Sequence, residues 1–154
     1  MNRQQFGISV LLGVVYFLLS SYLAAWTVTL GSADWWYESF GQSNISALAR
    51  LQLLHSLGLV VAALPFAVLV TLRFRTSWLS ISLTIGAVAS LLMLVEAIRV
   101  YFRLSSANLD IAPWQYANIT IDILKVGLLF LAVVALIRQA VPSNNALDLP
   151  PNRI

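Results

Sequence analysis

Residues 78–103, WLSISLTIGAVASLLMLVEAIRVYFR, contain the pattern that decides the fold. An apolar run ends in three charged residues, Glu96, Arg99 and Arg103, which follow one another at helical spacing. The run from Trp78 to Tyr101 exceeds the roughly 20 residues that an α-helix needs to cross a hydrocarbon core of about 30 Å. The stretch therefore predicts a transmembrane helix with a charged end.

Three further apolar runs have the same length, at roughly Phe6–Leu30, Ala47–Leu72 and Trp114–Ile137. Hydrocarbon satisfies no backbone hydrogen bonds, so runs of this length must be helical. The short connections predict that successive helices are up-and-down neighbours. We expect an all-α, integral membrane four-helix transmembrane bundle in one domain at 1–137, followed by a polar, proline-containing cytoplasmic tail at 138–154 that is disordered.

The composition agrees with a bilayer environment. The 154-residue chain is 60% hydrophobic and 10% charged, with a mean hydropathy of +0.85. Soluble domains are about one quarter charged. The nine basic residues are scattered, unlike the clustered basic face of nucleic-acid binders, so no nucleic-acid partner is expected.

Few catalytic chemistries fit this sequence. The absence of cysteine excludes disulfides, thiolate metal sites and cysteine nucleophiles, and a single histidine excludes a bis-histidine haem within one chain. The sequence has neither a G-x-S-x-G nucleophile motif nor a glycine-rich phosphate loop. We therefore predict no catalytic residue, metal or cofactor, and favour a protein that is not an enzyme.

The arginines predict the orientation in the membrane. Arg3, Arg73, Arg75, Arg138 and Arg153 fall on one side of the predicted spans. The positive-inside rule places this side, with both termini, in the cytoplasm. One lysine against eight arginines, without cysteine, favours a bacterial inner membrane.

The first outer connection, about 31–46, is rich in aromatic residues: Trp35, Trp36, Tyr37 and Phe40. Its spacing predicts a short amphipathic helix on the outer membrane surface. An anchor at the interface is the favoured interpretation. The alternative is a docking surface for another membrane protein, because aromatic residues make good interface anchors.

Charged and polar residues gather towards the outer ends of three of the predicted helices. The six candidates for a polar site or a structural clasp are Arg50, His55, Glu96, Arg99, Asp122 and Lys125. Glu96 and Arg99 are three residues apart, as are Asp122 and Lys125, so each pair can meet on one helix face. Each acid thus has a base nearby, which favours a structural clasp. A ligand or proton site using His55 and Asp122 is the alternative.

Antiparallel packing of the last two helices would also bring the two ion pairs to one level. Crossed pairs of Glu96 with Lys125 and of Asp122 with Arg99 or Arg103 are then expected. Small-residue pairs in the first run, Ser9 with Gly13 and Ser21 with Ala25, favour packing within the bundle over an oligomer interface. In the third run Ser82, Gly86 and Ser90 form a close-packing face.

Three functions remain open on the sequence. The first is a non-enzymatic accessory or interaction subunit of a membrane complex, with the lipid bilayer and other membrane subunits or further copies of the chain as partners. The second is a binding or transport protein with an outward-facing polar site for an anionic or proton-coupled ligand. The third is a quinone-linked redox membrane subunit.

Overall fold

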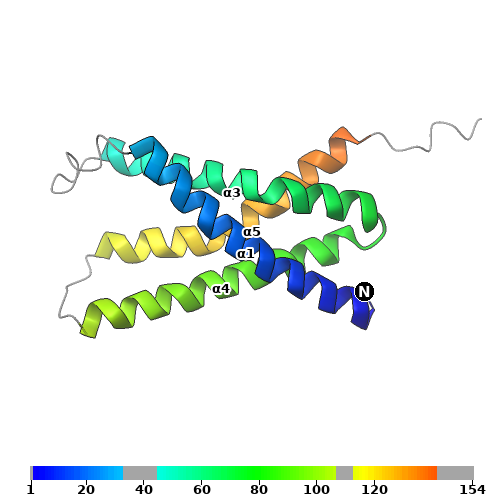
Figure 1. Cartoon of the computed structure of the whole chain (residues 1–154), viewed down its shortest axis with the longest axis horizontal. Coiled ribbons are helices and arrows are strands. Elements are labelled where there is room, and N and C mark those ends of the chain that lie inside the picture. Colours follow the sequence, from blue (N-terminus) through cyan, green and yellow to red (C-terminus); the bar gives the residue numbers. More distant parts are fainter. Residues whose placement is uncertain (1, 33–44, 107–112, 142–154) are drawn as a thin grey trace, which may run out of the picture.

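The computed structural model contains four long helices (Figure 1): α1 (Arg3–Ser32), α3 (Ile45–Arg73), α4 (Trp78–Ser106) and α5 (Pro113–Ala140). It describes the backbone of residues 2–32, 45–106 and 113–141, and the side chains within these ranges except at 30–32, 45–51, 104 and 113–118. The predicted amphipathic segment, with Trp35, Trp36, Tyr37 and Phe40, lies outside the described residues. So does the tail beyond residue 141.

Each helix carries a segment long and apolar enough to cross a membrane: Arg3–Thr29, Gln52–Arg73, Trp78–Arg103 and Ile119–Ala140. Among the described residues, the prediction of an all-helical fold with four helices long and apolar enough to span a membrane is confirmed, and it suggests a multi-pass membrane protein. The cytoplasmic placement of the termini and the bacterial inner membrane remain predictions.

The helices extend past the apolar runs that predict them. α4 continues beyond Tyr101 to Ser106, and α5 beyond Ile137 to Ala140. Hydropathy marks where the chain stops favouring hydrocarbon, whereas helix ends depend on backbone hydrogen bonds and local breakers. α5 begins at Pro113, which agrees with the preference of proline for the first helical position.

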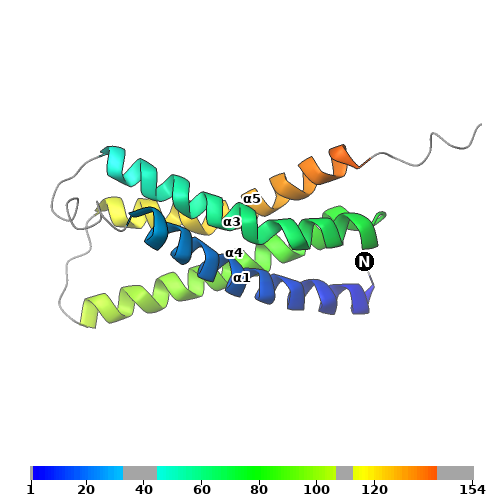
Figure 2. The ribbon, with the colours of Figure 1, turned by 45° about the horizontal axis from the view of Figure 1, so that its top comes forward.

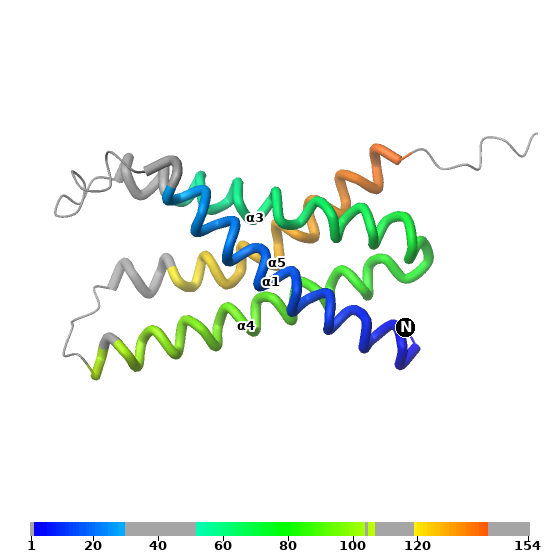
Figure 3. Tube along the Cα trace, in the orientation of Figure 1, coloured from blue at the N-terminus to red at the C-terminus, as the bar shows by residue number. Residues whose placement is uncertain are grey.

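The described helices alternate in direction, so that α1 and α4 run one way and α3 and α5 the other (Figures 1 and 3). The start of α1, the short connection at 74–77 and the end of α5 lie at one end, here named the turn end. The opposite end, where α1 and α4 finish, is named the loop end. An even number of spans returns the chain to the side where it began.

The order of the helices around the bundle differs from the prediction that all successive helices are neighbours. α1 packs against α3 and α4, and α5 packs against the same two helices, whereas α3 and α4 barely touch. The connection at 74–77 therefore joins helices on a diagonal, so the predicted pairing of α3 with α4 is wrong. Figure 2 shows the helices crossing near their middles and diverging beyond.

Glycines allow these close crossings. A Cβ at Gly13 would lie 2.8 Å from Cβ of Val88, and one at Gly58 would lie 2.6 Å from Cα of Ala24. Gly86 and Gly127 bring the backbones of α4 and α5 together in the same way. Ser9, Gly13, Ser82 and Gly86 are all buried, as expected for packing inside the bundle. Ala25 is exposed and Ser21 is only partly buried, so that pair does not pack inside the bundle as predicted.

Tyr16 occupies the centre of the core. Its ring is fully buried and packs against Phe66, with ring centres 5.6 Å apart, and against Phe130 at 4.8 Å. Its hydroxyl donates a hydrogen bond to the backbone carbonyl of Val126, with 3.0 Å between the oxygens. This bond connects α1 to α5 across the second diagonal of the bundle.

Candidate functional site

Four side chains form a polar cluster between α3 and α5: Gln52, His55, Asp122 and Lys125. The Lys125 Nζ lies 3.0 Å from Asp122 Oδ1, one helical turn away, and donates a hydrogen bond to Oε1 of Gln52 on α3. His55 Nδ1 lies 3.4 Å from the same Asp122 oxygen. Asp122 therefore faces one basic group on its own helix and one on its neighbour.

The cluster continues the stripes of residues that face the core. On α3, Gln52 and His55 precede the buried Leu59 by one or two helical turns on the same face. On α5, Asp122 precedes the buried Val126 by four residues. The sides of α3 and α5 that face the core therefore carry apolar residues in the middle of the bundle and polar residues in the half nearer the loop end.

The cluster is mostly enclosed. The exposed fractions of the side chains are 13% for Lys125, 19% for His55 and 27% for Asp122. An isolated charge at this degree of burial is costly, and inside a membrane segment the cost reaches about 2.5–3.5 kcal/mol at the bilayer centre. The pairing of Asp122 with Lys125 offsets that cost, because each charge lies beside its opposite.

Hydrogen bonding within the cluster is incomplete. His55 Nδ1 and Asp122 Oδ1 are both buried, yet neither meets hydrogen-bond geometry with any partner in the described part of the chain. The two close approaches to Asp122 are therefore charge contacts whose angles do not suit hydrogen bonds. Both atoms nevertheless have a close neighbour, because Asp122 Oδ1 lies 3.0 Å from the Lys125 ammonium and 3.4 Å from His55 Nδ1.

Hydroxyl groups tie the neighbouring backbone at the same level. Thr27 on α1 donates to the carbonyl oxygen of Leu54 at 2.8 Å, directly beside His55. Ser56 donates to the carbonyl of Gln52 at 2.6 Å within α3. The helix that carries His55 is thus fixed against α1 on one side and against α5, through Gln52, on the other.

Glu96 and Arg99 form a separate pair. Arg99 Nη1 donates to Glu96 Oε1 at 3.2 Å within α4, as the helical spacing predicts. These side chains are 47% and 59% exposed, far more than the cluster. The pair therefore lies on a side of α4 that faces away from the rest of the bundle.

The crossed pairs predicted between α4 and α5 are not formed among these residues. α4 and α5 meet at Gly86 and Gly127. At 1.5 Å per residue, Asp122 lies about 7 Å beyond that contact and Glu96 about 15 Å beyond it. The two pairs thus lie at different levels, and Asp122 turns towards α3. The sixth candidate, Arg50, belongs to α3, but its side chain lies outside the described residues.

Gln52 in the polar cluster and Tyr16 in the core are not among the six candidates. Gln52 could have been added from its three-residue spacing to His55, which places both on one helix face. Tyr16 carries no comparable signal, because one aromatic residue inside an apolar run resembles any other core position. In the described ranges no group of three His, Asp or Glu side chains is suited to hold a metal ion.

Comparison of the chain with models of protein families finds no match. Searches of functionally characterised proteins and of solved structures also find no significant relative.

Proposed function

We propose that the chain is a multi-pass membrane protein that binds an anionic or proton-coupled ligand at the cluster of Gln52, His55, Asp122 and Lys125. The observation that carries the proposal is an enclosed group of ionisable side chains inside apolar helices, in which Asp122 Oδ1 lies 3.0 Å from Lys125 Nζ and 3.4 Å from His55 Nδ1. Such residues are costly inside a membrane and are functional-site candidates by default.

The charges indicate the class of ligand. Asp122 and Lys125 carry opposite charges, so this pair has no net charge. The Lys125 ammonium and the His55 imidazole offer N–H donors to an anionic group. Adjacent imidazole and carboxylate groups are also typical of proton relays in membrane proteins.

The position of the cluster supports access from one side of the membrane. It lies between the mid-bundle crossings and the loop end, which the distribution of arginines predicts to be the outer side. Intramembrane ionisable residues commonly mark ligand or proton pathways. A site open to that side fits the expectation of an outward-facing binding protein.

The proposal is tested by purifying the protein in mild detergent and identifying retained small molecules by native mass spectrometry. We expect the wild-type chain to retain a ligand that His55→Ala and Asp122→Asn both lose. Glu96→Gln is the matched control, because it removes an acidic charge from α4 without touching the cluster. A ligand retained equally by all four proteins, or no ligand on the wild type, would contradict the proposal.

A second candidate function is that of an accessory subunit, and the outer face of α1 favours it. Ser21 and Ala25 form a small-residue pair that the bundle leaves partly or fully exposed, beside the exposed Leu18, Tyr22 and Trp26. Small residues let a further helix approach closely. Replacing Ala25 with Leu should then release a membrane partner that co-purifies with the wild type. A wild-type chain that purifies only as a monomer would count against this role.

A further inference from the structure

Basic side chains gather at the turn end, away from the polar cluster. The exposed arginines there are Arg3, Arg73, Arg75 and Arg138. The acidic residues whose side chains the structure describes, Glu96 and Asp122, both lie in the half nearer the loop end. The described surface of the turn end is therefore wholly basic in its charged groups.

One of these arginines is held in place by two contacts. Arg138 Nη1, at the end of α5, donates to the backbone carbonyl of Arg75 at 3.1 Å. Its guanidinium also lies over the ring of Trp78, 4.6 Å from the ring centre, at the start of α4. Arg138 thus bridges α5 to the connection between α3 and α4, and most of its N–H donors have no partner within the described residues.

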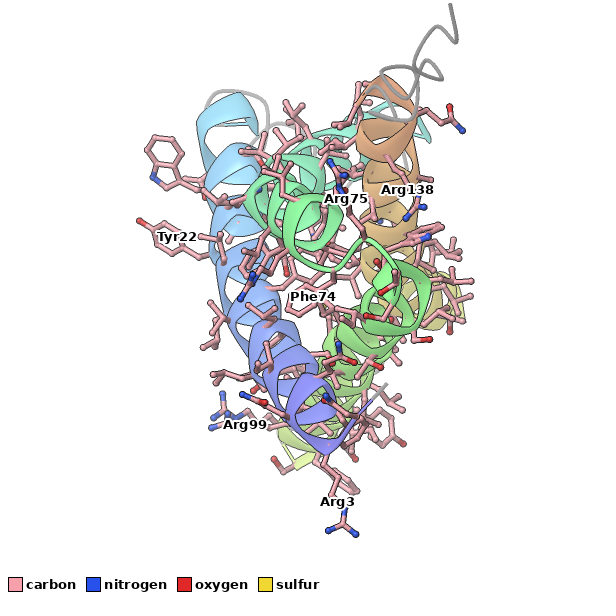
Figure 4. The ribbon with its side chains drawn as sticks, turned by 90° about the vertical axis from the view of Figure 1, so that its right-hand side faces the viewer. Arg3, Tyr22, Phe74, Arg75, Arg99 and Arg138 are labelled. Atoms are coloured by element: carbon pink, nitrogen blue, oxygen red, sulfur yellow. The ribbon has the colours of Figure 1, made fainter. Side chains whose placement is uncertain are left out.

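Figure 4 views the molecule from this end. Arg75 and Arg138 lie together on one side, whereas Arg3 lies at the opposite edge. Within the described residues, the Arg75 guanidinium makes no hydrogen bond or ion pair, since only its carbonyl contacts Arg138. The Arg138 guanidinium therefore lies against Trp78 and the Arg75 backbone, and the exposed Arg75 side chain belongs to the same edge of the molecule.

We propose that Arg75, Arg138 and Trp78 form a binding site for the head group of an anionic phospholipid. The three residues lie where the apolar spans begin and end, at Arg73, Trp78 and Ala140, which is the level of the head groups. Guanidinium groups bind phosphate oxygens through paired hydrogen bonds, and tryptophan prefers the membrane interface. The inference is independent of the ligand proposed for the polar cluster.

The arrangement favours a built site over diffuse attraction. An unconstrained arginine loses side-chain entropy when it binds a head group. Arg138 is already oriented by Trp78 and by the Arg75 carbonyl, so less freedom is lost on binding. Arg3 has the same charge at the same end of the bundle but shares neither contact. It should therefore contribute only general attraction to an anionic leaflet.

The test measures lipid binding to the full chain in detergent by native mass spectrometry, with phosphatidylglycerol and phosphatidylcholine of identical acyl chains as probes. We expect the wild type to prefer phosphatidylglycerol. Arg75→Gln and Arg138→Gln should each weaken its binding about 5-fold, the effect of one basic residue near an anionic surface. Arg138→Lys keeps the charge but loses the planar guanidinium group with its paired donors, so it should also weaken phosphatidylglycerol binding.

Arg3→Gln is the matched control and should change the binding by less than about 2-fold, because only diffuse attraction is lost. If Arg3→Gln and Arg75→Gln weakened phosphatidylglycerol binding equally, the proposed lipid-binding site would be wrong, and only general surface charge would explain the binding. Equal binding of the two lipids to the wild type would also overturn the proposed site. If Arg138→Gln disturbs folding, Arg75→Gln decides the question, because its guanidinium holds no part of the described structure together.

Discussion

Asp122 is the residue on which the polar cluster depends. It faces Lys125 on its own helix at 3.0 Å and His55 on α3 at 3.4 Å. Its carboxylate is thus the negative group that lies beside two basic side chains inside an apolar bundle. Removal of that charge affects both neighbours at once, which distinguishes Asp122 from an acid in a simple surface pair.

Asp122→Asn should lower the free energy of unfolding by about 1–3 kcal/mol, because Lys125 is left enclosed without its counter-charge. Glu96→Gln is the control and should cost less than about 1 kcal/mol, since its partner Arg99 is exposed. Denaturation in mixed micelles, followed by circular dichroism, measures both. Equal losses in the two variants would show that the pairs are equivalent, contrary to the structure.

Tyr16→Phe should destabilise the bundle by about 1 kcal/mol. The substitution removes the hydrogen bond to the Val126 carbonyl but keeps the ring contacts with Phe66 and Phe130. Tyr16→Ala should cost more, about 3–5 kcal/mol, because it also leaves a cavity. The same unfolding measurement applies. A Phe variant as unstable as the Ala variant would mean that the hydroxyl, and not the ring, holds the core.

At the residue scale, spacing along one helix was sufficient to predict the pairs Glu96–Arg99 and Asp122–Lys125. Helical periodicity alone decides which residues on one helix meet. The partners across helices, His55 and Gln52, depend on the rotation and offset of α3 against α5. Those quantities arise from side-chain packing along the whole interface, so the sequence of either helix does not contain them.

At the scale of elements, glycines determine which helices cross. The Cβ positions of Gly58 and Gly13 are occupied by atoms of α1 and α4, respectively. These contacts bring α1 onto both α3 and α4 and leave α3 and α4 on a diagonal. Long apolar runs predict the number of helices and their approximate lengths. Apolar runs do not predict this order, because a lipid-facing stripe and a core-facing stripe are equally hydrophobic.

Gly58→Ala should destabilise the bundle by about 1–3 kcal/mol through overpacking. The added methyl group would meet the backbone of Ala24 at 2.6–2.7 Å, so α1 and α3 would have to separate. Gly7→Ala is the matched control, because nothing lies within 4 Å of its Cβ position. We expect that variant to be neutral or slightly more stable. A neutral Gly58→Ala in an unfolding measurement would contradict the α1–α3 crossing.

The absence of native cysteine makes the helix order directly testable. A Cβ at residue 13 lies 2.8 Å from Cβ of Val88, within about 1 Å of the separation found in disulfides. Gly13→Cys with Val88→Cys should therefore form a cross-link rapidly on oxidation, visible as a mobility shift on electrophoresis. Gly13→Cys with Leu83→Cys, an exposed position on α4, should not. Comparable rates for the two pairs would contradict the packing of α1 on α4.

At the scale of the whole molecule, the two halves of the bundle differ in chemistry. The half towards the loop end holds the enclosed cluster around Asp122, and the turn end presents exposed arginines around Trp78. Glycine crossings and the Tyr16 core separate the two regions. This division supports a protein with a ligand site facing one side of the membrane and a lipid-binding surface at the other.

His55 and Asp122 belong to one cluster from which Glu96 is separate. His55 is the only histidine, so nuclear magnetic resonance of protein labelled with ¹⁵N-histidine gives a single imidazole as a local reporter. We predict that Asp122→Asn shifts the imidazole resonances of His55 strongly and that Glu96→Gln leaves them in place. Unchanged resonances in Asp122→Asn, or equal shifts in both variants, would contradict the account.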